Sequence, residues 1–346
     1  MKFSPGSALS WCATALLAFT TFPAASQKIT TFDFPNGLGT TPVGISQFGQ
    51  VVGYYGDVKL GAVRGFVRNP NGTIWSFGAQ GSNFTVPTGL NAWGQIVGYF
   101  GQQQDSVYFD KGFIRNPFGQ MTVFSVPGQI ITLPQDISMA GEAVGYYEDI
   151  AQTTHGFIRH ANGTISNFDA GPSFWDGGTI ALGINSWGRS TGWFRDLNFK
   201  QHGFLLRADG TMESFDAPGA VNTVPQAINA MGQITGSYTD ASQVTHGFVR
   251  QPDGTFETFD APDATNTWGV AINDRGQITG TFAAGTSDMH GFVRNANGKI
   301  KTLDVRRAIS TVPTGINASG QVTGVWSDAN RDQHGFVTGS FNASNF

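Results

Sequence analysis

Short stretches in which apolar and polar residues alternate follow one another along almost the whole chain after Gln27. An alternation with a period of two places successive side chains on opposite faces of a β-strand. An amphipathic helix would need a period of 3.6 over 11 or more residues, and no segment of this sequence offers one. Turns built on glycine, Asn-Gly or Asp-Gly separate the stretches. The pattern therefore predicts an all-β chain.

One part of the chain illustrates the predicted strands. A first strand is expected over Thr223–Asn229, a second over Gly232–Tyr238 and a third over His246–Arg250. The turn at Asp253-Gly254 then closes a hairpin onto a fourth strand over Thr255–Asp260, because residues of these types tolerate the positive φ angles of a tight hairpin. Each such unit is therefore expected to form one small antiparallel sheet.

This four-strand pattern occurs seven times. A Gly-Phe dipeptide marks each copy at intervals of 44 or 47 residues, and its glycines are Gly65, Gly112, Gly156, Gly203, Gly247, Gly291 and Gly335. Four strands in about 44 residues match a propeller blade, whereas a β-solenoid coil is usually shorter. We therefore predict a seven-bladed β-propeller of four-stranded blades, forming a single domain over residues 27–346.

The two ends of the repeat array predict how the ring closes. The array begins with a lone fourth strand over Ile29–Asp33 and ends with a third strand over His334–Val337. Pairing of these strands would complete the last blade and remove the exposed edges of the first and last units. We therefore expect the N-terminal strand to close the propeller.

The first 26 residues have the features of a signal peptide. Lys2 is followed by an apolar stretch over Leu9–Phe22, and small residues precede a cleavage site near Ser26. The apolar stretch is too short to span a membrane. We therefore expect residues 1–26 to be removed and the remaining chain to be secreted.

The single cysteine, Cys12, belongs to that leader. A lipoprotein signal would need a small residue before the cysteine, and Trp11 stands there instead. The mature chain would then hold no cysteine, so its stability would rest on packing without disulfides.

Composition removes several classes of protein. With 13% aromatic and 13% charged residues, the chain has the opposite composition to a disordered one. Its net charge is -4 and no run of Lys or Arg occurs, so nucleic-acid binding is not expected. We also expect a monomer without a membrane-spanning segment. No phosphate-binding loop, HExxH, CxxC or nucleophile elbow is present, so no cofactor is predicted.

The repeated pattern H-G-F-V-R, D/N-G-T, T-F-D-x-P and G-I-N-x-x-G-Q-I-T-G resembles the HAF repeat of extracellular bacterial proteins, from Ile29 to about Val337. A glycine-rich second strand before an aromatic third strand is also similar to the kelch layout. The HAF resemblance implies export and a repeat fold, and it brings no reaction or catalytic residues. The kelch resemblance implies that the P-x-G-I-N strand lies nearest the ring axis.

Five of the six histidines precede a third strand, and an aspartate stands six residues before four of them. The resulting pairs are Asp149/His155, Asp196/His202, Asp240/His246 and Asp328/His334. Such pairs could be acid/base couples or metal ligands. Their recurrence favours a structural hydrogen bond that closes a loop, because a catalytic site is needed only once. Arg64 and Lys111 hold the histidine slot in two units, which argues against a ring of metal sites.

Function is better sought where one unit departs from the others. The unit between His155 and His202 has a lengthened loop over 170–178, and Trp193 replaces the usual tyrosine or smaller residue. Together with the long loop over 101–111, these departures predict ligand-binding residues on one face, namely Trp175, Asp176, Trp193, Arg195, Tyr108 and Asp110. His160, on a hairpin outside the repeated slot, is expected to be solvated.

A tryptophan beside carboxylates and amides suits a sugar, which needs an apolar platform and directional hydrogen bonds. The leading hypothesis is a secreted, non-catalytic binding module for a glycan or an extracellular protein. The alternative is an extracellular polysaccharide lyase or glycosidase that uses Asp176 or Asp196 with a histidine. A structural surface component without a ligand is the third possibility.

Overall fold

The computed structural model describes residues 28–104, 107–172, 177–285 and 288–342, and every regular element in these ranges is a β-strand. The all-β prediction is therefore confirmed. The same four strands recur in each repeat of the sequence, and we call them the first to fourth strands. The first strands are β2 (Gly37–Ile45), β6 (Phe84–Leu90), β10 (Ile131–Ile137), β14 (Thr179–Ile184), β18 (Asn222–Ile228), β22 (Asn266–Ile272) and β26 (Ser310–Ile316).

Each second strand contains a glycine, and each third strand contains the Gly-Phe dipeptide. The second strands are β3 (Val51–Asp57), β7 (Ile96–Gln104), β11 (Ala143–Glu148), β15 (Ser190–Arg195), β19 (Ile234–Thr239), β23 (Ile278–Ala283) and β27 (Val322–Ser327). The third strands are β4 (Ala62–Arg68), β8 (Val107–Arg115), β12 (Thr154–Arg159), β16 (Gln201–Leu206), β20 (Thr245–Arg250), β24 (Met289–Arg294) and β28 (Gln333–Thr338).

The fourth strands are short, with four residues each. They are β1 (Ile29–Phe32), β5 (Ile74–Phe77), β9 (Met121–Phe124), β13 (Ile165–Phe168), β17 (Met212–Phe215), β21 (Phe256–Phe259) and β25 (Ile300–Leu303). Within each group of four, neighbouring strands pair antiparallel. Two single parallel contacts, Val63 with Phe84 and Asp110 with Ile131, join strands β2 to β13 into one larger sheet.

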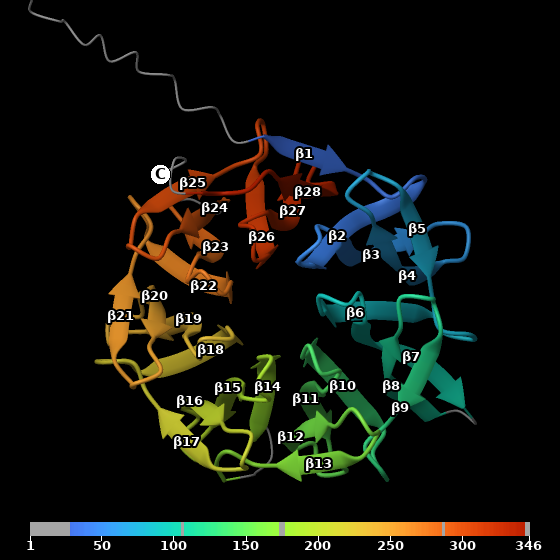
Figure 1. The fold of residues 1–346 in the computed structure, drawn as a ribbon, viewed down its shortest axis with the longest axis horizontal. Coiled ribbons are helices and arrows are strands. Elements are labelled where there is room, and N and C mark those ends of the chain that lie inside the picture. Colours follow the sequence, from blue (N-terminus) through green and yellow to red (C-terminus); the bar gives the residue numbers. More distant parts are fainter. Residues whose placement is uncertain (1–27, 105–106, 173–176, 286–287, 343–346) are drawn as a thin grey trace, which may run out of the picture.

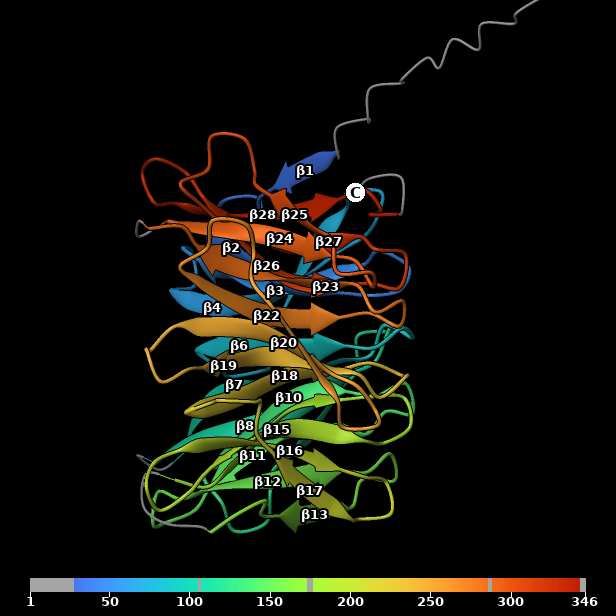
Figure 2. The same cartoon turned by 90° about the vertical axis from the view of Figure 1, so that its left-hand side faces the viewer.

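The groups are arranged around a common axis, with the first strands innermost and the fourth strands at the rim (Figure 1). Because neighbouring strands are antiparallel, the connections fall at two ends of the ring, as the side view in Figure 2 shows. We call one end the loop face; it carries the second-to-third and fourth-to-first connections, such as 149–153 and 216–221. The other end is the turn face, which carries turns such as 185–189 and hairpins such as 160–164.

Close packing explains the Gly-Phe dipeptide. Phe204 in β16 is fully buried, as are its counterparts in the other third strands. A Cβ atom placed on Gly203 would lie 2.5 Å from the ring of Phe215 in the fourth strand. The glycine therefore lets an aromatic ring lie directly on the backbone of the third strand.

An arginine at the end of most third strands joins neighbouring groups at the turn face. Arg250 Cζ lies 4.7 Å from the centroid of Phe215 in the preceding group, a cation–π geometry, and Arg250 also pairs with Glu213. The equivalent contacts are Arg68 with Phe32, Arg115 with Phe77, Arg159 with Phe124 and Arg294 with Phe259. Two third strands end differently, in Leu206 and Thr338.

The first and last units of the chain are in contact. Strand β1 pairs with β28, with Ile29 opposite Thr338 and Phe32 opposite Gly335. The side-chain amide of Asn317 also donates to the carbonyl of Ser46, at 3.0 Å. The 28 strands thus fit seven blades of four. In the described residues no helix is long and apolar enough to cross a membrane.

Candidate functional site

A cavity of about 420 Å³ lies on the loop face, where the group β10–β13 meets the group β14–β17. Its volume falls within the roughly 300–1,000 Å³ typical of small-ligand sites. Its walls combine an aromatic ring, two opposite charges and polar groups. The lining residues are Glu148, Gln152, Thr154, Gly177, Ile180, Trp193 and Arg195.

Two of the predicted ligand-binding residues, Trp193 and Arg195, meet in this cavity. Both come from β15, and their spacing of two places them on the same face of the strand. Arg195 Cζ lies 5.8 Å from the ring centroid of Trp193, so the guanidinium stacks over the indole. Trp193 is half-buried, which leaves part of the ring as an apolar surface.

Gly177, at the end of the lengthened connection, forms one edge of the cavity. The backbone N–H of Ala170 donates to Thr179 Oγ1 at 2.8 Å, and the N–H of Arg195 donates to the Gly178 carbonyl at 3.2 Å. Gly178 has φ 124°, and a Cβ there would lie 1.9 Å from the Thr154 carbonyl oxygen. Only glycine fits this close approach. The predicted residues Trp175 and Asp176 lie outside the described residues.

Asp110 lies at a different junction, where β8 meets β10, so the structure does not group it with Trp193. Burial raises the pKa of its carboxyl, and its buried Oδ1 has no hydrogen-bond partner in the structure. For Tyr108 only the backbone position in β8 is described. The six predicted residues are therefore not shown to form one site.

The structure brings together all four predicted Asp/His pairs, although loosely. The nearest nitrogen–oxygen distances are 3.4 Å for Asp149 and His155, 3.4 Å for Asp196 and His202, 3.5 Å for Asp240 and His246, and 3.9 Å for Asp328 and His334. Each aspartate also accepts backbone hydrogen bonds within its own loop. The structural function assigned to the pairs stays a prediction.

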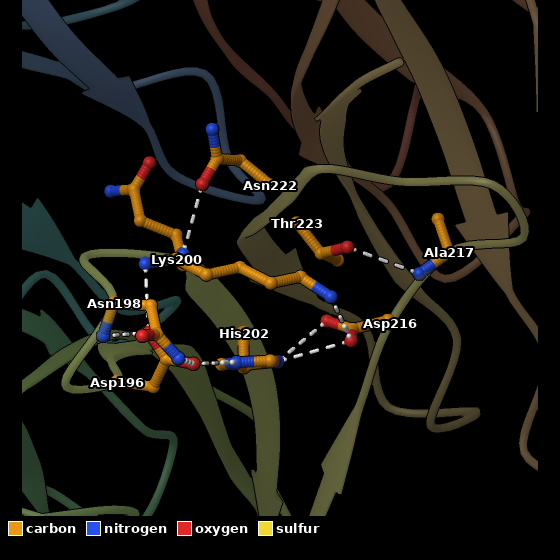
Figure 3. A network of polar contacts seen from close by, with 9 residues as sticks. Asp196, Asn198, Lys200, His202, Asp216, Ala217, Asn222 and Thr223 are labelled. Atoms are coloured by element: carbon orange, nitrogen blue, oxygen red, sulfur yellow. Dashed lines mark hydrogen bonds and ion pairs between the residues drawn. The ribbon is translucent and has the colours of Figure 1, made fainter. Parts of the chain in front are cut away.

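Each of these histidines has a second and closer carboxylate that sequence analysis missed. His202 Nδ1 lies 2.9 Å from Asp216 Oδ1, and Lys200 Nζ lies 2.8 Å from Asp216 Oδ2 (Figure 3). The corresponding partners in the other units are Asp169, Asp260, Asp304 and Asp33, at 2.8–3.0 Å. In the sequence the signal is an offset of 14 residues between the histidine and an aspartate in four units, which links the third strand to the fourth; the partner of His334, Asp33, lies at the other end of the chain.

Aromatic rings in the second strands complete this arrangement. Five of these rings stack on the histidines at centroid distances of 4.4–5.2 Å. For His246, burial lowers the pKa, but the hydrogen bonds and charges of Asp260 and Asp240 outweigh that effect and raise it. Among the described residues no group of three or more His, Cys, Asp and Glu could hold a metal ion.

His160, which was expected to be solvated, has a side chain that is 36% exposed and that also has two hydrogen-bond partners. Its Nδ1 lies 3.0 Å from Glu142 Oε1 and its Nε2 lies 3.0 Å from Ser166 Oγ. The hairpin on which His160 stands gives no local signal for either partner, because both come from other elements. Strand pairing places Ser166 opposite Ile158, two residues before His160, and the turn that carries Glu142 beside it.

The fold is similar to that of solved β-propeller domains. The chain aligns with the propeller domain of the Trilobed protease from Pyrococcus furiosus at 11% identity and a TM-score of 0.57, over 89% of this chain and 99% of that one. It aligns with acylaminoacyl peptidase from Pyrococcus horikoshii at 11% identity and a TM-score of 0.57, over 89% of this chain and 52% of that one.

A third similar structure is puromycin hydrolase, at 12% identity and a TM-score of 0.54, over 88% of this chain and 52% of that one. The chain therefore corresponds to about half of the length of both hydrolases. No protein-family model and no curated protein matches it. At these identities the comparisons show the fold alone, which confirms the predicted propeller architecture.

Proposed function

We propose that the loop face of this protein is a non-catalytic binding module that takes a glycan into its cavity. The observation that carries the proposal is the combination of a half-buried Trp193 ring with Arg195, Glu148 and Gln152 around one cavity. The indole offers a flat apolar surface for a sugar ring, and the charged and amide groups offer partners for hydroxyls. The likeness to propeller domains supports the scaffold and selects no ligand.

The enzyme alternative is less well supported. Asp196, the one of its two candidate carboxylates that lies in the described residues, accepts hydrogen bonds from the backbone N–H groups of Asn198 and Lys200 and also contacts His202 (Figure 3). These contacts lower the pKa of Asp196 despite some desolvation, so the group is held as an anion within its own loop. A general acid would need the opposite shift.

The surroundings of the cavity suit a ligand larger than a monosaccharide. Ile150 is 94% exposed and Leu197 is 68% exposed, and they stand on the two loops that adjoin the cavity. Such apolar side chains at a rim extend the contact area beyond the cavity itself. A short oligosaccharide, or an extracellular protein that covers the rim, would contact both the cavity and these rim side chains.

The test is a glycan array followed by calorimetry on the best ligand. Trp193→Ser introduces the residue that stands at the same position in β19, so the strand tolerates it. The expected result is at least a tenfold loss of affinity, about 1.4 kcal/mol. Trp93→Ala, at an exposed tryptophan on the turn face, is the control and is expected to bind like the wild type. Absence of any array signal from a folded sample, or equal affinity of Trp193→Ser, would contradict the proposal.

We further propose that the 28 strands form a closed seven-bladed ring of the HAF type, with a kelch-like strand order. The pairing of β1 with β28 supports closure. The proposal includes residues 1–26 as a cleaved signal peptide, residues 27–346 as one secreted, monomeric domain, and an extracellular ligand. Mass spectrometry of the protein expressed with its leader in a bacterial host would show a mature N-terminus near Gln27.

A further inference from the structure

A second cavity, of about 360 Å³, lies on the turn face between β12–β13 and β16. Its apolar wall contains Phe168, Trp187 and Leu206. Leu206 stands where five other third strands end in an arginine, which there lies over the phenylalanine of the preceding group. Leucine has no guanidinium, so this cation–π contact is absent at this junction, and Leu206 lines the cavity instead.

On the polar wall of this cavity, hydrogen bonds link three side chains in a row. Ser166 Oγ, on β13, lies 3.0 Å from His160 Nε2, and His160 Nδ1 lies 3.0 Å from Glu142 Oε1. Ser166 is exposed, and the side chain of His160 is 36% exposed, so a ligand can reach both. All three residues line the cavity.

The other units show what a purely structural contact looks like at these positions. There Gln50 donates to Asn69 at 3.0 Å, and Gln233 donates to Gln251 at 2.9 Å. Two neutral amide side chains therefore suffice to link the turn before the second strand to the hairpin after the third strand. In the unit β10–β13 a carboxylate and an imidazole replace them, a serine extends the series, and Leu206 lines the cavity beside it.

We propose that Ser166, His160 and Glu142 form a nucleophilic triad that cleaves small carboxylic esters. A nucleophile within hydrogen-bond reach of a base, which a third group orients, is the arrangement that acyl transfer requires. Glu142 accepts the Nδ1–H of His160, which leaves Nε2 as the acceptor for the hydroxyl proton of Ser166.

In the first step Ser166 Oγ bonds to the ester carbonyl carbon while its proton passes to His160 Nε2. Collapse of the tetrahedral intermediate breaks the bond to the alcohol oxygen, and that oxygen takes the proton from His160. Water then attacks the acyl-serine, gives a proton to His160, and releases the carboxylic acid as the proton returns to Ser166. No oxidant, metal or further reactant is needed.

The cavity walls indicate the class of ester. Trp187 and Leu206 suit a short apolar acyl or aryl group. Arg207, also on the wall, pairs with Glu213, and a guanidinium has five N–H donors, so others are available for the carbonyl oxygen or for an anionic substituent. We therefore expect short-chain esters rather than peptides or polysaccharides as substrates.

The test uses the full mature chain with a fluorophosphonate probe and with 4-nitrophenyl acetate and butyrate. The wild type is expected to be labelled on Ser166, as located by peptide mass spectrometry, and to hydrolyse the esters. Ser166→Ala and His160→Asn are expected to reduce ester turnover by at least about 100-fold, and Glu142→Gln by at least about tenfold. His160→Asn and Glu142→Gln introduce residues that stand at these positions in other units, so folding is expected to persist, and melting curves verify it.

Ser242→Ala, at an exposed serine of a loop-face connection, is the matched control and is expected to react like the wild type. Absence of labelling on Ser166 in the folded wild type would overturn the proposal. Ester turnover that survives Ser166→Ala would also overturn it, since the reaction would then come from His160 or another surface group. Glycan binding through Trp193 is measured in a separate assay, so the outcome of the esterase test does not decide the glycan proposal, and the reverse also holds.

Discussion

At the scale of single residues, Asp136 shows how one departure from the repeat changes the electrostatics of the interior. It occupies a position in β10 where the other first strands have glycine or alanine. Its Oδ2 accepts the backbone N–H of Ile184 in the next group at 3.0 Å, and its Oδ1 accepts the N–H of Ile137 at 2.8 Å. Burial nevertheless raises its pKa from 3.8 to about 6.

This shift predicts a pH-dependent contribution to stability. Because the folded pKa lies above the unfolded one, the folded state holds the proton more tightly, and the wild type gains stability as pH falls from 7 through 6 towards 4. Asp136→Asn removes the titration. Between pH 7 and pH 4.5, the unfolding free energy of the wild type is expected to rise by about 1–3 kcal/mol relative to the variant. Urea titrations measure it, and parallel pH profiles would contradict the assignment.

At the scale of elements, one threonine fixes each connection between neighbouring groups. Thr223 Oγ1, at the start of β18, accepts the backbone N–H of Ala217 at 3.0 Å, and Thr223 is fully buried. Equivalent bonds join Thr85, Thr132, Thr267 and Thr311 to the residue six positions earlier. Thr179 makes the same bond to Ala170, which is why the connection 170–178 can be longer without displacing β14.

Thr223→Val therefore has a specific expected effect. Valine keeps the shape of threonine but leaves the N–H of Ala217 without its acceptor, at a cost of about 1–3 kcal/mol in unfolding free energy. Thr223→Ser keeps the hydroxyl and is expected to cost less, although it loses a methyl group. Chemical denaturation measures the unfolding free energy of both variants and of the wild type. A larger loss for serine than for valine would show that packing, rather than this hydrogen bond, stabilises the connection.

Elements were easier to predict from the sequence than contacts between them. Alternation and turn residues predict strands such as β18–β21 to within about two residues, because these signals are local. The pairing of His202 with Asp216 depends on strand register, and that of His160 with Glu142 depends on two strands and a turn meeting in space. The neighbouring residues Trp193 and Arg195 were found because both break the repeat within one strand.

At the scale of the whole molecule, the two cavities described above lie at one junction, between the groups β10–β13 and β14–β17, at opposite faces, and two further cavities lie at other junctions of the described residues. Elsewhere the repeated contacts recur with little change. Seven near-equivalent units provide a rigid scaffold, and departures from the pattern provide chemistry without loss of the shared packing. This arrangement is the reason to look for function at this junction.

Deletion of Ile29–Phe32 tests closure of the ring. Without β1 the edge of β28 is exposed, and Arg68 and Phe66 lose their contacts with the Phe32 ring. A fall in melting temperature of about 10 °C is expected, since about 5 kcal/mol at about 2 °C per kcal/mol is lost. Thr31→Ser, at an exposed residue of the retained strand, is the control. A melting curve unchanged by the deletion would show that β1 does not hold the ring together.

Hydrogen–deuterium exchange of the wild type, with and without the best glycan from the array, tests the central claim most directly. Binding in the loop-face cavity predicts slower exchange in 148–154 and 177–195, with no change in the equivalent segments of the other units. Protection confined to the turn face, or to the connections of other units, would contradict the account and place the ligand elsewhere.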